Sequence, residues 1–132
     1  MIALDTNLLV RLLTNDDARQ SAKAEAWLRD NASARTPAYV DHIVLCELSW
    51  VLERSYGYAR ALVHEAIDAL LNQEQLKVEA PDVVRQALGW HHSGVADFSD
   101  YLLAARAQAA GYAPVLTFDK KAARTATHRL LR

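Results

Sequence analysis

Five acidic residues stand at positions where carboxylates could do chemistry together. Asp5 directly follows the short apolar run Ile2-Ala3-Leu4, and Asp119 directly follows the apolar run 114–118 late in the chain. Both runs are predicted strands, and an α/β sheet places its site beyond the carboxyl ends of its strands. Each of the two acids could equally be a simple cap at a strand-to-helix turn.

Glu47 lies inside a predicted helix among apolar neighbours. The residues three and four positions away are Ile43, Val44, Trp50 and Val51. A carboxylate buried in such a stripe is costly unless a partner offsets its charge. A buried salt bridge to an arginine is one explanation, and a bound cation is the other.

Asp97 and Asp100 stand three residues apart at the start of a predicted helix. This spacing puts both side chains on one side of the first turn. Because the helix dipole favours acids at an N-terminus, Asp97 could be only a cap. Two acids at once favour a shared cluster with the other three.

Carboxylates gathered from separate segments repel one another and raise one another's pKa unless a positive charge compensates. Oxygen-only ligands select a hard cation, Mg²⁺ or Mn²⁺. One or two such ions can polarise a phosphoryl oxygen, generate hydroxide and stabilise the leaving oxygen. The acidic set therefore predicts metal-dependent phosphodiester hydrolysis, which requires no side-chain nucleophile.

The elements that must position these acids alternate between strands and helices. Hydrophobic periodicity predicts strands at 2–4, 35–40, 76–78 and 114–118. It predicts helices at 8–13, after the capping residues 15–17, at 42–56, at 59–73, after Pro81, and from Ser99 to Gly111. This alternation implies parallel pairing, right-handed crossovers and an α/β sandwich. With no repeat and no linker, residues 1–132 are predicted to form a single domain.

Composition excludes several classes of protein. The chain has 132 residues, of which 52% are hydrophobic and 23% charged, so it is neither disordered nor fibrous. No apolar run approaches the roughly 18–20 residues that span a bilayer. No basic segment precedes the first apolar run, so we expect no signal peptide and a cytoplasmic protein. The single cysteine, Cys46, excludes a disulfide framework and a thiolate zinc site.

The net charge of −1 hides an uneven distribution. Residues 120–132 contain no acid and five basic residues: Lys120, Lys121, Arg124, Arg129 and Arg132. Such a segment could contact phosphates, or it could be a solvated helix face. Arg11, Lys120 and Lys121 could each hold the phosphates of a substrate or pair with the acids, and the sequence leaves both roles open.

Four short motifs resemble, in order, those of the PIN-domain ribonucleases. They are Asp5-Thr6-Asn7, Cys46-Glu47-Leu48, Asp97-Phe98-Ser99-Asp100 and Thr117-Phe118-Asp119-Lys120-Lys121. Length and pattern look most like the VapC toxins of prokaryotic type II toxin–antitoxin pairs, and the resemblance covers essentially the whole chain.

The resemblance implies a site and a biological role. Asp5, Glu47, Asp100 and Asp119 would bind Mg²⁺ or Mn²⁺, Asp97 would be a further acid of the catalytic cluster, and Asn7 and Thr117 would support it by hydrogen bonds to carboxylates. It also implies a three-layer α/β/α sandwich around a central parallel sheet of about four to five short strands. The implied partners are an RNA substrate, a second copy of the chain and a neutralising antitoxin. We expect Lys120 and Lys121 to contact the RNA, and we expect no membrane partner.

Two alternatives stay open. A PIN-like scaffold could bind partners without catalysis, but it would be expected to have lost an acid, and none is lost. A haloacid-dehalogenase-type phosphatase would use Asp5 as nucleophile. That mechanism requires a second acid two residues later, where this chain has Asn7.

Overall fold

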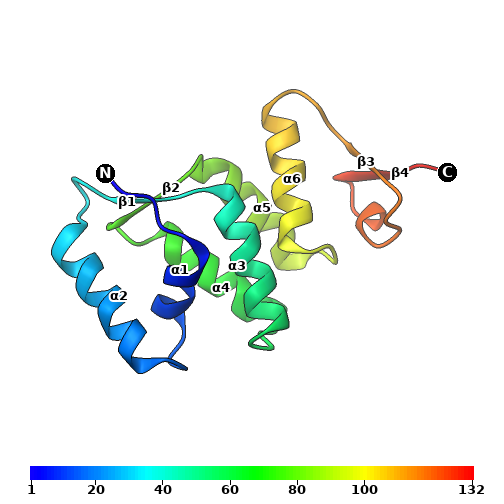
Figure 1. The fold of residues 1–132 in the computed structure, drawn as a ribbon. Helices are drawn as coiled ribbons and strands as arrows, with labels where there is room; N and C mark the ends of the chain where they lie inside the picture. The colour runs from blue at the N-terminus through cyan, green and yellow to red at the C-terminus, as the bar shows by residue number, and fades with distance from the viewer. The chain divides into compact units, whose positions relative to one another are not determined.

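In the computed structural model, which describes residues 1–132, six α-helices alternate with short parallel strands (Figure 1). The chain divides into two units, Met1–Glu79 and Ala80–Arg132, and each is described by itself. The single domain over residues 1–132 stays a prediction.

The N-terminal unit contains four helices and a small sheet. The helices are α1 (Thr6–Leu13), α2 (Ala18–Asn31), α3 (His42–Arg54) and α4 (Arg60–Leu71), and the strands are β1 (Ala38–Val40) and β2 (Leu76–Val78). β1 and β2 pair in parallel, with Ala38 opposite Leu76. The predicted strand 2–4 contributes only an isolated parallel bridge from Ala3 to Tyr39.

Helix starts and core positions in this unit follow the sequence pattern. The Asp17 side chain accepts a hydrogen bond from the Gln20 N–H at 3.0 Å, and Asp41 accepts one from the Val44 N–H at 2.9 Å. These bonds satisfy backbone donors that a helix N-terminus leaves free. The fully buried residues recur at helical spacing on α3 and α4: Leu45, Leu48, Leu52, Val63 and Ile67.

The C-terminal unit joins two packed helices to a second small sheet. Its elements are α5 (Pro81–Ser93), α6 (Phe98–Ala109), β3 (Val115–Thr117), the 3₁₀ turn η1 (Ala122–Arg124) and β4 (His128–Leu130). β3 and β4 pair in parallel, with Val115 opposite His128. The buried side chains of this unit include Val84 and Leu88 of α5 and Phe98 and Leu102 of α6.

The α/β class and the parallel pairing are confirmed, with three differences. The strands form two sheets, β1–β2 and β3–β4, one in each unit. Residues 120–132 are not a helix face, because they form η1 and the unpredicted strand β4. Helix α6 begins at Phe98, with Asp97 at the N-cap position, one residue before the predicted start at Ser99.

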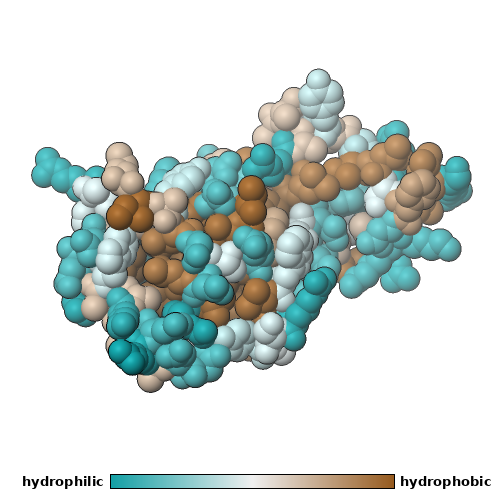
Figure 2. Space-filling model, viewed as in Figure 1, coloured by the Kyte–Doolittle hydropathy of each residue, from teal (hydrophilic) through white to brown (hydrophobic).

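None of the helices combines the length and the hydrophobicity needed to cross a membrane. Apolar residues nevertheless reach the surface among polar ones on the face shown in Figure 2. The most exposed large apolar side chains after Met1 are Tyr112 and Phe118, each 78% exposed, and Ile43, 71% exposed.

Candidate functional site

Asp5 occupies the N-cap of α1. The chain reaches it through the Ala3 bridge, where the Leu4 N–H donates to the Tyr39 carbonyl at 2.9 Å. Asp5 Oδ1 then accepts the Leu8 N–H at 3.2 Å. The cap uses one carboxylate oxygen, so the acid retains a second oxygen with which to bind a ligand.

Thr6 links this cap to the second acid of the N-terminal unit. Its hydroxyl Oγ1 donates to Glu47 Oε1 at 3.0 Å, which ties α1 to α3. Thr6 was not among the predicted site residues, although a hydroxyl directly after Asp5 was a usable signal. Asn7 was predicted to support a carboxylate, but it is exposed and no hydrogen bond joins it to Asp5 or Glu47. Thr6 makes the type of contact that was expected of Asn7.

Glu47 is exposed, so the expectation that it is buried in an apolar stripe is wrong. Its neighbours on the same helix face, Ile43 and Trp50, are themselves 71% and 39% exposed. The buried face of α3 is a different one, formed by Leu45 and Leu52 with Leu48. Because apolar neighbours share a face without fixing whether it is covered, the helical spacing alone could not give the burial of Glu47.

Three acids of the C-terminal unit lie within electrostatic range of one another. Burial raises the pKa of Asp100 above its ordinary value of 3.8, and the charges of Asp97 and Asp119 raise it further. A hydrogen bond from the Asp97 backbone and the charge of His128 act in the opposite direction. Asp97 stands at the N-cap position of α6, but its side chain makes no capping hydrogen bond. The Asp97 carboxylate therefore does not cap the helix, although a cap was one explanation for an acid at this position.

Asp119 is held by the backbone that follows it. Its Oδ1 accepts the N–H groups of Lys121 at 2.9 Å and Ala122 at 3.3 Å, which starts η1. Thr117 acts on the backbone rather than on a carboxylate, because its hydroxyl accepts the Asp119 N–H at 3.0 Å. Lys120 and Lys121 are both exposed, and neither forms an ion pair in the structure.

A hydrogen-bonded chain fixes His128 beside this cluster. The Thr125 hydroxyl donates to the Ala122 carbonyl at 2.8 Å, so in its 2.6 Å contact with Thr127 it must accept. Thr127 has then used its single hydroxyl proton, and in its 2.8 Å contact with His128 Nδ1 the ring nitrogen must donate. The chain therefore places a proton on Nδ1 of the buried His128, a residue that the sequence analysis did not assign to the site.

The loop that leads into Asp97 depends on Tyr101. The buried Tyr101 hydroxyl accepts the N–H groups of Val95 at 3.1 Å and Ala96 at 3.3 Å. A Cβ at Gly94 would overlap this same hydroxyl. Glycine at position 94 thus lets the loop close over Tyr101, and Tyr101 in turn fixes the residues just before Asp97.

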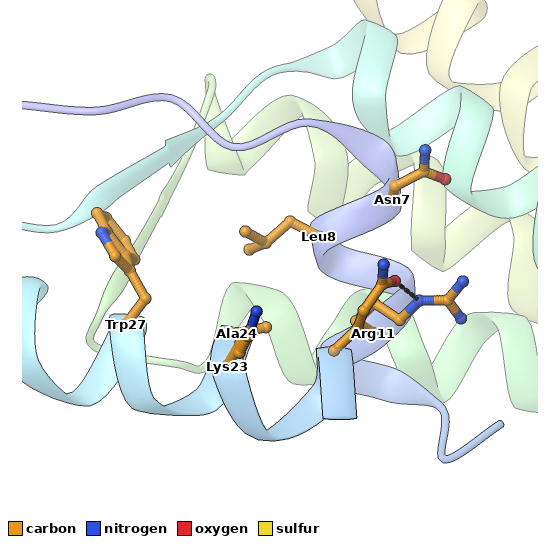
Figure 3. Close-up of a pocket in the computed structure, with 7 residues that line it drawn as sticks. Asn7, Leu8, Arg11, Lys23, Ala24 and Trp27 are labelled. Carbon is orange, nitrogen blue, oxygen red and sulfur yellow. Dashed lines mark hydrogen bonds between the residues drawn. The ribbon is translucent and has the colours of Figure 1, made fainter. Parts of the chain in front are cut away.

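A pocket of about 410 Å³ lies between α1 and α2 (Figure 3). Leu8 and Ala24 line it together with Trp27, Lys23 and Asn7. Arg11 also lines it.

Arg11 was a candidate for binding RNA phosphates. Its Nε donates to Gln20 Oε1 at 2.7 Å, and its Nη1 pairs with Asp16 Oδ1 at 2.8 Å. Arg11 Nη1 also donates to the Tyr56 hydroxyl at 3.3 Å. In the structure Arg11 therefore pairs with an acid outside the candidate cluster.

The donor chemistry fits a hard divalent cation, although no group of three His, Cys, Asp or Glu side chains stands ready to hold a metal ion. All the candidate donors are carboxylate oxygens, the ligands that Mg²⁺ and Mn²⁺ take. The charges of two further acids, Asp97 and Asp119, act on the half-buried Asp100, and a bound cation would offset the resulting repulsion. Within each unit the structure thus assembles part of the predicted acidic set.

Comparison with known proteins identifies the family. Over 121 residues the chain is 25% identical to a VapC ribonuclease of Aquifex aeolicus (strain VF5), a match that covers 92% of this chain and 89% of that protein. It is also similar to the crystal structure of VapC20 of Mycobacterium tuberculosis, described as a sarcin-ricin loop cleaving toxin. That similarity has 21% identity over 94% of both chains and a TM-score of 0.47. Residues 2–127 match the PIN domain family. Since this match spans nearly the whole chain, the protein belongs to the PIN domain family.

Proposed function

We propose that this chain is a VapC-type endoribonuclease toxin that hydrolyses RNA phosphodiester bonds with Mg²⁺ or Mn²⁺. The observation that carries the proposal is the complete acidic set within a PIN-domain chain. Asp5, Glu47, Asp100 and Asp119 all belong to the four motifs that resemble those of the PIN-domain ribonucleases, and all four motifs lie within the matched residues 2–127. A non-catalytic scaffold would have no need to keep a half-buried acid among like charges.

The proposed cation ligands are Asp5, Glu47, Asp100 and Asp119, with Asp97 as a further acid. When bound, the cation would polarise the phosphoryl oxygen and lower the pKa of a water molecule. The chain's own residues prepare the ligands. Thr6 orients one oxygen of Glu47, and the N–H groups after Asp119 hold one of its oxygens and leave the other free. The Asp5 cap acts in the same way.

The proposed setting follows from the same family assignment. We propose a cytoplasmic protein that forms homodimers and is neutralised by a cognate antitoxin. The exposed Lys120 and Lys121 directly follow Asp119, so they are placed in the chain to attract an RNA strand that the acidic cluster would repel.

Cleavage of a labelled single-stranded RNA pool tests the proposed function. We expect cleavage in Mg²⁺ or Mn²⁺ and none in EDTA, with activity restored when the metal is added back. Full activity in EDTA would contradict the metal mechanism. A pure, folded protein that cleaves no RNA in either metal would favour the non-catalytic scaffold.

A further inference from the structure

A second pocket lies in the C-terminal unit, between α5, α6 and the segment around β4. It has a volume of about 460 Å³, within the range that binds small ligands. Its walls are Trp90, Pro114, Gln108, Thr127 and Arg129, together with three alanines. The pocket is therefore lined by one large aromatic ring, small apolar groups, and a few polar side chains.

Trp90 is placed to act as a stacking platform. It is half-buried, and its ring lies 6.3 Å from that of the fully buried Tyr101, which anchors it. The small side chains of Ala104, Ala113 and Ala126 leave space beside it. A flat ring with open space next to it suits a nucleobase, because every base has a face that can stack.

The polar groups around the pocket match the rest of a nucleotide. The exposed Arg129 supplies a guanidinium, which forms bidentate contacts with phosphate. The exposed Gln108 supplies an amide that can both donate to and accept from a base edge. Three of the lining residues, Ala126, Thr127 and Arg129, belong to the segment 120–132. That segment has five basic residues and no acid, and its positive charge favours a polyanionic nucleic acid as the occupant.

The pocket continues the helix face that carries the acidic cluster. Asp100, Ala104 and Gln108 follow one another at spacings of four on α6, so they share a face, and about 6 Å of helix axis separates each from the next. On the other wall, Thr127 accepts the Nδ1–H of His128, whose charge acts on Asp100. A strand with a phosphate at the acids could continue along α6 into this pocket.

We propose that this pocket is a nucleotide subsite for the single-stranded RNA substrate. A base next to or near the cleaved bond stacks on Trp90, and Arg129 binds its phosphate. The subsite rests on the proposed nuclease function and adds to it a place where one base is read.

Abasic scanning tests the subsite. A short single-stranded oligoribonucleotide that the wild-type protein cleaves is made with the base removed at each position in turn, and kcat and KM are measured for wild type, Trp90→Phe and Trp90→Leu. In the wild type, we expect removal of one particular base to lower kcat/KM by about 5- to 150-fold, chiefly through KM. Trp90→Leu should abolish the penalty at that position only, and Trp90→Phe should retain part of it.

Two further variants sharpen the test. Trp27→Leu changes a partly exposed tryptophan in the pocket of the other unit and should keep the wild-type abasic profile. Arg129→Gln should lower the slope of log affinity against log salt by about 0.7, the value for one phosphate contact on a single strand.

Two results would overturn the subsite while leaving the nuclease intact. One is an abasic profile for Trp90→Leu that equals that of the wild type. The other is a Trp90→Leu protein with an altered oligomeric state and unchanged RNA kinetics, which would assign the pocket to a protein partner. A wild-type protein that cleaves no RNA in Mg²⁺ would instead overturn the proposed function itself.

Discussion

The two units hold their acids in different ways. In the N-terminal unit, Asp5 and Glu47 are both exposed. Asp5 accepts a hydrogen bond from the Leu8 N–H, and Glu47 accepts one from the Thr6 hydroxyl. In the C-terminal unit, Asp100 is partly buried and faces like charges, and its pKa is raised as a result. Asp5 and Glu47 are thus ordered by hydrogen bonds that exist without a ligand, as is Asp119, whereas the partly buried Asp100 faces like charges.

This contrast indicates which group has more to gain from a cation. A carboxylate that is partly desolvated next to other acids is stabilised by a positive charge more than an exposed one is. The C-terminal acids should therefore dominate the dependence of stability on metal, while both groups should be required for catalysis.

The largest expected effect is the loss of catalysis when either group is broken. Asp5→Asn and Asp100→Asn keep the shape of the side chain but remove the charge that would hold the cation. We expect each to lower kcat/KM for RNA by more than about 100-fold. This loss exceeds the roughly 10- to 100-fold that is typical when a residue that only contacts a metal's ligands is changed. The matched control is Asp82→Asn, which changes an acid in the first turn of α5 outside the cluster. Undiminished cleavage by pure Asp5→Asn protein would remove the N-terminal group from the site.

Removal of the Thr6 hydroxyl should produce a smaller loss. Thr6→Val keeps the shape but frees Glu47 from its 3.0 Å hydrogen bond. We expect a loss of about 10- to 100-fold in activity, with Thr6→Ser close to wild type because the hydroxyl is restored. Activity of the Thr6→Val protein equal to that of wild type would show that Glu47 needs no such positioning.

Gly94→Ala should destabilise the C-terminal unit. The added Cβ overlaps the Tyr101 hydroxyl, and overpacking of this kind costs about 1–3 kcal/mol. Gly89→Ala is the matched control, because a Cβ there meets nothing within 4 Å and alanine favours a helix by about 0.5–1 kcal/mol. The midpoint of urea unfolding should therefore fall for Gly94→Ala and rise for Gly89→Ala. A Gly94→Ala protein as stable as wild type would mean that the loop can close without Tyr101.

The helices and strands could be predicted from the sequence more completely than the contacts of the candidate site. The caps at Asp17 and Asp41 and the strand at 76–78 follow from local patterns, because turn and helix-start chemistry is local. β4 was missed because its three residues lie in a basic segment, where charge masked the alternation of buried His128 and exposed Arg129.

The site could be predicted by residue type but not by contact. Asp5, Glu47, Asp97, Asp100 and Asp119 were named from the sequence, yet the partners that hold them were not. Thr6 and Tyr101 act across 41 and 5 residues of the chain respectively, and hydrogen bonds of this kind leave no periodic trace in a sequence. The exposure of Glu47 depends on which face of α3 is covered, and this is a tertiary property.

A difference in pH dependence gives the smallest expected effect. The pKa of Asp100 is raised, so the stability this acid contributes is fully present below about pH 3.8 and is lost as the pH rises through its folded-state pKa. The pKa of Asp16, in the N-terminal unit, is lowered, chiefly by the hydrogen bond from Tyr56. Its contribution is fully present above pH 3.8 and is lost as the pH falls.

Unfolding of Asp100→Asn and Asp16→Asn in EDTA, each compared with wild type from acid to neutral pH, measures these contributions. The difference from wild type should change with pH in opposite directions for the two variants. A stability difference that changes with pH in the same direction for both variants would contradict the electrostatic difference between Asp100 and Asp16.

The most direct test of the account is the binding of Mn²⁺, measured by isothermal titration calorimetry on the wild type, Asp5→Asn and Asp100→Asn proteins. If the acids of the two units act together on a divalent cation, the wild type binds Mn²⁺ and both variants bind it at least about tenfold more weakly. Binding of Mn²⁺ by Asp5→Asn with wild-type affinity and stoichiometry would contradict the account, because the N-terminal acids would then take no part in holding the cation.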